Sequence, residues 1–198
     1  MARPRMFDEE RALDAAMHTF WKKGYEATST QDLCDATGLG RSSVYNTFKS
    51  KHDLFERALS RYIDTMTTAQ LAVLEDSRLN GADRIRTLFT MVIDGDAEHR
   101  AEGRSIGCLT VNTTVELAAR DTGAARMLER DTARRLTALR AAVEEGRRDG
   151  SITSTRDTGA LARFLNAAIA GMRISGQGGA DRAAMESIAE VTLDALTH

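Results

Sequence analysis

Apolar residues recur every three or four positions through most of this chain, which is the pattern of amphipathic α-helices. At the N-terminal end, the pattern predicts a helix that starts at the acidic run Asp8–Glu10 and stops at Gly24. A shorter helix ends at Gly38, and a third begins after Gly40. Because the two glycines enclose a tight turn between two helices, this region is predicted to be a helix-turn-helix.

Capping patterns mark where two of these helices begin. Two overlapping patterns precede the second helix, Thr28 with Gln31 and Ser29 with Asp32, and the sequence leaves both open. A further capping box at 50–53 starts a long fourth helix. We expect that helix to connect the N-terminal module to the rest of the chain.

The remaining chain continues the same helical periodicity. Leu79–Gly81 interrupts it, and a fifth helix is predicted to end at Asp94–Asp96. A sixth segment covers Ile106–Leu117, and a long seventh helix ends at Gly146 or Gly150. Two more apolar stripes, separated by a glycine-rich segment, predict helices eight and nine.

The composition agrees with an all-α fold of about nine helices. Hydrophobic residues make up 42% of the 198 residues and charged residues 28%, and there is a single proline. Two cysteines are too few for a disulfide framework, and no stretch resembles a leader peptide or a membrane span. We therefore expect a cytoplasmic protein without a membrane partner. The net charge of −2 means that any contact with DNA depends on a local basic patch.

The N-terminal residues resemble the DNA-binding region of the TetR (tetracycline repressor) family over about residues 7 to 62. The resemblance rests on several spaced positions: Ala12–Ala16, Phe20, Gly24–Tyr25, Thr28–Ser29, Leu33, Ala36–Leu39, Val44–Tyr45, Phe48, Lys51 and Leu54–Phe55. It implies a helix-turn-helix DNA-binding domain at 1–50 and a helical effector-binding and dimerisation domain at 51–198. The family often has serine before the recognition helix, where this chain has Gly40, which is also an acceptable N-cap.

The resemblance also implies which residues meet operator DNA. Thr28, Tyr45 and Lys51 match positions that hold phosphates, whereas the exposed side of the third helix enters the major groove. Arg41 is suited to guanine and Asn46 to adenine. The full expected set is Thr28, Ser29, Gln31, Arg41, Ser42, Ser43, Tyr45, Asn46, Lys49 and Lys51. The alternative is that Arg41, Ser42 and Ser43 form only a solvated helix face.

The last two helices resemble the family's dimer interface, so a homodimer is expected that reads a palindromic operator. For a small-molecule effector, the sequence offers Phe89 and Phe164 as the only aromatic residues beyond Tyr62. We expect a small or aliphatic effector rather than a large planar cation.

The segment around Cys108 resembles one from a branch of the family that includes sensors of reactive electrophiles. Cys108, Asn112 and Glu116 are spaced to share a helix face and complete a tentative effector pocket with the two phenylalanines. Three roles remain open for Cys108: covalent or redox sensing, pocket lining without chemistry, and plain packing.

No catalytic, cofactor or metal-binding signature is recognised in the sequence, and the histidines show no metal-ligand spacing. The sequence therefore predicts a non-enzymatic repressor that a small-molecule effector releases from its operator. The alternatives are a thiol-based sensor that uses Cys108 and a DNA-binding protein without effector control.

Overall fold

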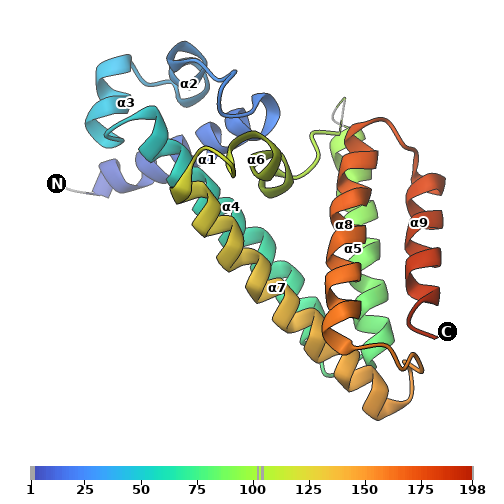
Figure 1. The fold of residues 1–198 in the computed structure, drawn as a ribbon. Helices are drawn as coiled ribbons and strands as arrows, with labels where there is room; N and C mark the ends of the chain where they lie inside the picture. Colours follow the sequence, from blue (N-terminus) through green and yellow to red (C-terminus); the bar gives the residue numbers. More distant parts are fainter. Residues whose placement is uncertain (1–2, 102, 104, 198) are drawn as a thin grey trace. The chain divides into compact units, whose positions relative to one another are not determined.

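The computed structural model describes residues 3–101, 103 and 105–197, which form nine α-helices and no strand (Figure 1). The all-α prediction is confirmed. The helices are α1 (Arg3–Lys23), α2 (Thr30–Thr37), α3 (Arg41–Thr47), α4 (Lys51–Leu74), α5 (Gly81–Ala101), α6 (Leu109–Leu117), α7 (Thr122–Asp149), α8 (Thr158–Gln177) and α9 (Arg182–Asp194). None of these helices is long and apolar enough to cross a membrane.

The chain forms two compact units, and each is discontinuous in sequence. The first consists of the described parts of Met1–Thr65 together with Cys108–Leu128, and the second contains the described parts of 66–107 and 129–198. Helices α4 and α7 therefore contribute to both units. The domain boundary predicted from the sequence, between residues 50 and 51, falls inside the first unit at the start of α4.

The first unit is built around large side chains of α1, α2, α3 and the first turns of α4. Phe20 and Phe55 are fully buried, and their rings meet edge to face with 5.2 Å between centroids. Leu33 anchors α2 and Val44 anchors α3 in the same core. Each of these helices therefore buries one face and leaves the opposite face available for other contacts.

Local capping sets the boundaries of α2. Ser29 is the N-cap: its hydroxyl accepts from the Asp32 N–H, and the Asp32 carboxylate accepts from the Ser29 N–H. This settles the open choice in favour of the Ser29 pattern. Gly38 ends the helix with φ at 69°, a left-handed conformation that glycine adopts without steric cost.

Helix α1 begins earlier than the sequence predicts, at Arg3 rather than at the acidic run Asp8–Glu10. Proline interrupts a helix when it lies in the interior. Pro4 lies in the first turn, where a backbone N–H has no acceptor within the helix, so its missing N–H costs no hydrogen bond. The prediction of a start at Asp8 is therefore wrong.

The second unit has α5, α8 and α9 packed against one another (Figure 1). Its core also takes residues from α7 and from the last turn of α4. The fully buried larger side chains of this core include Ile85, Leu88, Phe89, Leu139, Val143, Leu165, Met172 and Met185.

Helix α5 continues to Ala101, so the predicted end at Asp94–Asp96 is wrong. The Asp96 carboxylate pairs with Arg100 one turn later, at 2.7 Å, and also accepts from the Ser105 hydroxyl. Arg100 in turn donates to the carbonyl oxygens of Gly176 and Ala180. These tertiary contacts outweigh the low helix propensity of the Asp-Gly-Asp sequence.

Candidate nucleic-acid interface

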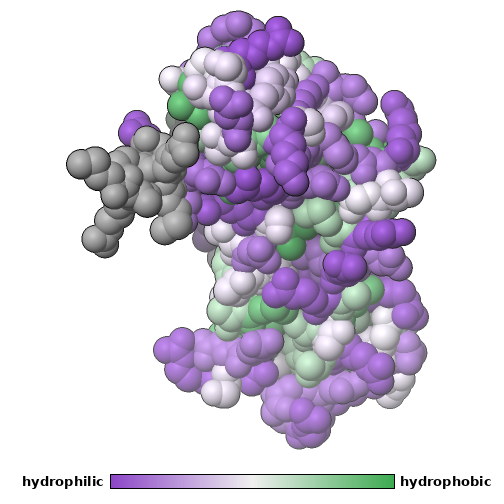
Figure 2. Space-filling view, turned by 90° about the vertical axis from the view of Figure 1, so that its left-hand side faces the viewer, coloured by the Kyte–Doolittle hydropathy of each residue, from purple (hydrophilic) through white to green (hydrophobic). Residues whose placement is uncertain are grey.

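Helix α3 exposes a polar face, and its opposite face is packed in the core. Arg41, Ser42, Ser43 and Asn46 are exposed, whereas Val44 is buried on the opposite side. Figure 2 shows the face that carries α3, and its upper part is mostly purple and white, that is, hydrophilic to neutral. The side chains expected to read bases therefore all have free surface.

Tyr45 joins α3 to the start of α2. Its hydroxyl lies 2.7 Å from the Thr30 hydroxyl, and its ring is half-buried between the two helices. One of the two hydroxyls donates to the other, which leaves an O–H hydrogen available for an outside acceptor such as a phosphate oxygen. The contact therefore aligns both helices of the helix-turn-helix and offers a polar group at the surface.

The residues before and in the first turn of α2 differ in what they expose. Ser29 and Gln31 are exposed, and the Gln31 amide donates to Asp35 one turn later. Thr28 is fully buried, and its hydroxyl donates to the Gly24 carbonyl oxygen at 2.6 Å. The Thr28 side chain has no surface with which to hold a phosphate, so it stabilises the turn before α2 instead.

Two lysines lie at the junction between α3 and α4. Lys49 is exposed. The Lys51 ammonium lies 4.4 Å from the centroid of the Tyr25 ring and donates to the Glu26 carbonyl oxygen at 3.5 Å. These contacts hold the positive charge of Lys51 close to the turn between α1 and α2.

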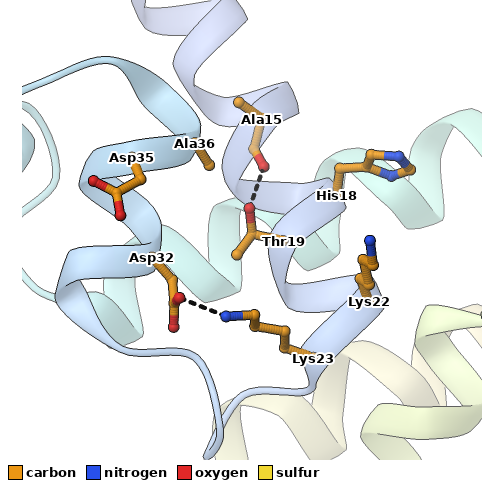
Figure 3. Close-up of a pocket in the computed structure, with 8 residues that line it drawn as sticks. All are labelled: Ala15, His18, Thr19, Lys22, Lys23, Asp32, Asp35 and Ala36. Carbon is orange, nitrogen blue, oxygen red and sulfur yellow. Dashed lines mark hydrogen bonds and ion pairs between the residues drawn. The ribbon is translucent and has the colours of Figure 1, made fainter.

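A groove of about 370 Å³ lies between α1 and α2, and Figure 3 shows the side chains that line it. Lys23 of α1 pairs with Asp32 of α2 at 2.5 Å across one end of the groove. The Lys23 hydrogen bond, together with the Ser29 backbone and hydroxyl donors, lowers the pKa of Asp32 to about 2. Asp32 therefore remains ionised near neutral pH and keeps α2 tied to α1.

Glu116 supports the same region from α6. Its two carboxylate oxygens accept from the backbone N–H groups of Tyr25 and Glu26, at 2.9 and 2.8 Å. These amides lie in the turn between α1 and α2, where no helix supplies acceptors. The sequence pattern placed Glu116 in an effector pocket and did not reveal this contact, because the partners lie about ninety positions away and no local pattern links them.

The five residues of the expected effector pocket are divided between the two units. Phe89 is fully buried in the core of the second unit, and Phe164 is 46% exposed on α8. Cys108, Asn112 and Glu116 belong to the first unit. The Cys108 thiol is 7% exposed, and its sulfur accepts from the Tyr62 hydroxyl at 3.4 Å.

A groove that none of these five residues lines lies in the second unit. It measures about 620 Å³ and runs between α4, α5 and α7. Its lining residues are Leu71, Leu74, Glu75, Arg84, Ala133, Arg134, Thr137, Ala138 and Ala141. This size is within the range of small-molecule sites.

A buried three-helix scaffold with an exposed polar helix after a glycine turn defines a helix-turn-helix DNA-binding protein. Comparison with known families assigns both halves of the chain. Residues 12–58 match the model "Bacterial regulatory proteins, tetR family", and residues 81–191 match "Tetracyclin repressor-like, C-terminal domain".

Individual relatives agree with these matches. The HTH-type transcriptional repressor ComR of Escherichia coli K12 is 32% identical over 96% of this chain and 90% of its own length. The uncharacterised regulator YezE of Bacillus subtilis 168 is 30% identical over 99% of this chain and 100% of its own. The chain belongs to the TetR family, and it is a DNA-binding transcriptional regulator.

A solved structure supports the fold. A cysteine mutant of the TetR-family regulator CifR, in complex with a 26-bp operator duplex, superposes with a TM-score of 0.79. It is 23% identical to this chain, and the match covers 94% of this chain and 95% of that one. The narrower resemblance of the Gly107–Leu109 segment to electrophile sensors stays a prediction.

Proposed function

We propose that the chain is a dimeric repressor that binds a palindromic operator and leaves it when a small molecule binds. The observation that carries this proposal is the exposed polar face of α3, held from behind by the buried Val44. In this role the chain binds ligands, catalyses no reaction, and acts in the cytoplasm, where the operator is. Relatives such as ComR are named repressors, and CifR was solved with its operator.

The contacts divide into two kinds. Arg41 and Asn46 read base edges in the major groove, and Ser42 and Ser43 contact bases or nearby phosphates. Around them a set of polar groups holds the phosphate backbone and fixes the register of α3: Ser29, Gln31, Tyr45, Lys49 and Lys51.

The second unit offers a surface for dimerisation through α8 and α9. Of the four large apolar side chains that are exposed among the described residues, three lie on these helices: Phe164, Ile174 and Val191. Burying such side chains against a second copy favours association. Their location agrees with the dimer interface that the sequence predicts, and two copies supply the two recognition helices that a palindrome requires.

For the effector we propose the groove between α4, α5 and α7. Its leucine and alanine lining suits a small aliphatic molecule. Arg84 and Glu75 also line the groove and are available to polar groups of that molecule. The effector binds more tightly to a dimer whose recognition helices are misplaced for the operator. Operator affinity then falls by an amount set by the difference in effector affinity between the two states of the dimer. Reversible binding is favoured over thiol chemistry, because Cys108 is buried beneath the Tyr62 hydroxyl.

The experiment is a fluorescence-anisotropy titration against the DNA upstream of the protein's own gene, at two salt concentrations. We expect Arg41→Ala to weaken specific binding by about ten- to a hundredfold, the cost of one bidentate base contact. Lys51→Ala should weaken specific and non-specific binding alike and reduce the salt dependence by about one phosphate contact.

The matched control is Arg78→Ala, which removes an exposed arginine that pairs with Asp76 in the second unit. It should bind like the wild type. Equal affinities for the wild type and Arg41→Ala would contradict the assignment of α3 as the recognition helix.

A further inference from the structure

Three potential metal ligands meet in the first unit, although the sequence predicts no metal site. His52 and Glu56 lie one turn apart on α4, and Asp121 directly precedes α7. One ligand atom from each residue lies within 4.8 Å of the other two, and all three side chains are half-buried. The i, i+4 spacing of His52 and Glu56 is a partial signal in the sequence, but Asp121 is too distant along the chain to be recognised.

In this cluster the His52 ring faces both carboxylates at distances longer than a good hydrogen bond. His52 Nε2 is 3.6 Å from Glu56 Oε1, and Nδ1 is 3.4 Å from Asp121 Oδ2. Good N–H···O bonds are about 2.7–3.2 Å long. A neutral imidazole has one N–H and one lone pair, so one of its nitrogens directs a lone pair at a carboxylate. A cation bound at that nitrogen, whether a proton or a metal ion, removes this repulsion.

The two carboxylates have no basic partner other than His52 among the described residues. Lysine and arginine side chains of the first unit pair with Glu9, Asp14 and Asp32 instead. The cluster thus concentrates two negative charges around one imidazole, and this arrangement attracts a cation.

Neighbouring groups hold two of the ligands in position. Asp121 Oδ1 accepts from the Ala124 N–H at 2.9 Å, so this carboxylate caps α7 while Oδ2 is directed at His52. A Cβ atom at position 123 would lie 2.2 Å from Glu56 Oε1, so a side chain at this position would displace the Glu56 carboxylate from where it faces His52. Supporting contacts of this kind orient the ligands of metal sites.

We propose that His52, Glu56 and Asp121 bind a divalent cation of the zinc class. One imidazole nitrogen and two carboxylate oxygens are ligands that Zn²⁺ accepts, whereas Ca²⁺ and Mg²⁺ prefer oxygen alone. Three protein ligands with water in the fourth position form a common open site. A tetrahedral ion with bonds of about 2.0–2.1 Å separates its ligands by roughly 3.3 Å. The two carboxylates face different ring nitrogens of His52, and the three ligand atoms lie within 4.8 Å of one another, so the side chains have to move together when an ion binds.

The consequence is a link between two segments of the first unit. The ion ties the first turn of α4 to the start of α7, and His52 directly follows Lys51. The His52 ring also meets the Tyr25 ring edge-on, with 6.1 Å between the ring centroids. The Lys51 ammonium lies over the same Tyr25 ring. Binding therefore fixes residues beside the proposed phosphate contacts, although the proposal itself does not depend on operator binding.

The test is a Zn²⁺ titration of the full-length, tag-free protein in competition with a chromophoric chelator, without DNA. The wild type should bind one equivalent, and His52→Ala and Glu56→Gln should each weaken this binding at least about tenfold. Asp121→Asn should weaken it as well, and because it keeps an oxygen to cap α7 while it removes the ligand charge, it serves as the variant that preserves the fold. His18→Ala, which changes an exposed histidine of the same unit, should bind like the wild type.

Two further readouts separate this site from adventitious binding. Co²⁺ should give the visible absorption of a four- or five-coordinate ion in the wild type and not in His52→Ala. Zn²⁺ should raise the unfolding temperature of the wild type and not that of His52→Ala, since it binds only the intact folded cluster. Absence of a bound equivalent, or binding that survives the loss of His52, would overturn the proposal and leave the operator-binding proposal untouched.

Discussion

Thr28 and Ser29 are neighbouring hydroxyl residues with opposite roles. Both fit a capping pattern in the sequence, and both were expected to face DNA. In the structure Thr28 is fully buried and donates to Gly24, whereas Ser29 is exposed and caps α2. Sequence spacing finds the capping region but does not tell which hydroxyl is buried, because burial depends on how α1 and α2 pack.

The Asp32 carboxylate leads to a prediction about pH. Its pKa is lowered to about 2 by Lys23 and Ser29, so it lies below the unfolded value. Because the pKa of Asp32 is lower in the folded protein than in the unfolded chain, its carboxylate stabilises the fold fully at pH values above the pKa of the unfolded chain. This stabilisation is lost as the pH falls through the pKa of the folded protein. The difference in unfolding temperature between the wild type and Asp32→Asn should be constant above about pH 5 and shrink between about pH 4 and 2.

Thermal unfolding monitored by circular dichroism measures this difference. Asp35→Asn is the matched control on the same helix, because Asp35 accepts from the Gln31 amide of its own helix. Its difference from the wild type should be small. A difference for Asp32→Asn that does not change over this pH range would show that the Lys23 and Ser29 contacts do not stabilise α2.

At the level of elements, helix ends set by a local glycine were predictable, and an end set by tertiary contacts was not. Gly24 and Gly38 end their helices as predicted, because each takes a left-handed conformation that stops a helix locally. The end of α5 was missed because Arg100 joins it to the carbonyl groups of Gly176 and Ala180, which are distant in sequence.

The α1–α2 turn and α6 form a specific contact between elements of the first unit. Glu116→Ala removes the acceptor for the Tyr25 and Glu26 N–H groups. We expect the free energy of unfolding to fall by about 1–2 kcal/mol, the usual cost of leaving such donors unpaired. Glu116→Gln keeps an acceptor oxygen and should lose less.

Urea denaturation followed by fluorescence of the single tryptophan, Trp21, is a suitable measurement. Val115→Ala controls for changes in α6, since Val115 is 79% exposed, and it should leave the stability within about 0.5 kcal/mol. A Glu116→Ala protein as stable as this control would show that the carboxylate does not support the turn.

For the whole molecule, the family, the all-helical fold and the helix-turn-helix were predictable from the sequence, because those follow from local periodicity and spaced motif residues. The expected effector pocket stays a prediction, and the structure gives two of its residues other contacts. Phe89 is in the core and Glu116 holds a backbone turn, and both roles depend on packing between distant segments. The His52 cluster was missed for the same reason.

The dimer proposal gives a prediction at this scale. Ile174→Glu and Val191→Glu place charges on side chains that are 53% and 68% exposed on α8 and α9. Burying unpaired charges in an interface is costly, so each variant should shift the protein toward monomer and weaken operator binding. Sedimentation velocity measures the association.

Val115→Glu places the same charge on an exposed valine of α6, outside α8 and α9, and should remain dimeric. Circular dichroism should show that all three variants keep their helices. Dimers of unchanged stability in both Ile174→Glu and Val191→Glu would remove α8 and α9 from the interface.

The most direct test of the account is selection of bound sequences from a randomised DNA pool by the wild-type protein. A symmetric dimer with α3 in the major groove should enrich a palindrome whose half-sites lie about one helical turn, roughly 34 Å, or a multiple apart. Arg41→Ala should relax the preference at a symmetric pair of positions. A single asymmetric motif, or no enriched motif at all, would contradict a dimeric helix-turn-helix regulator.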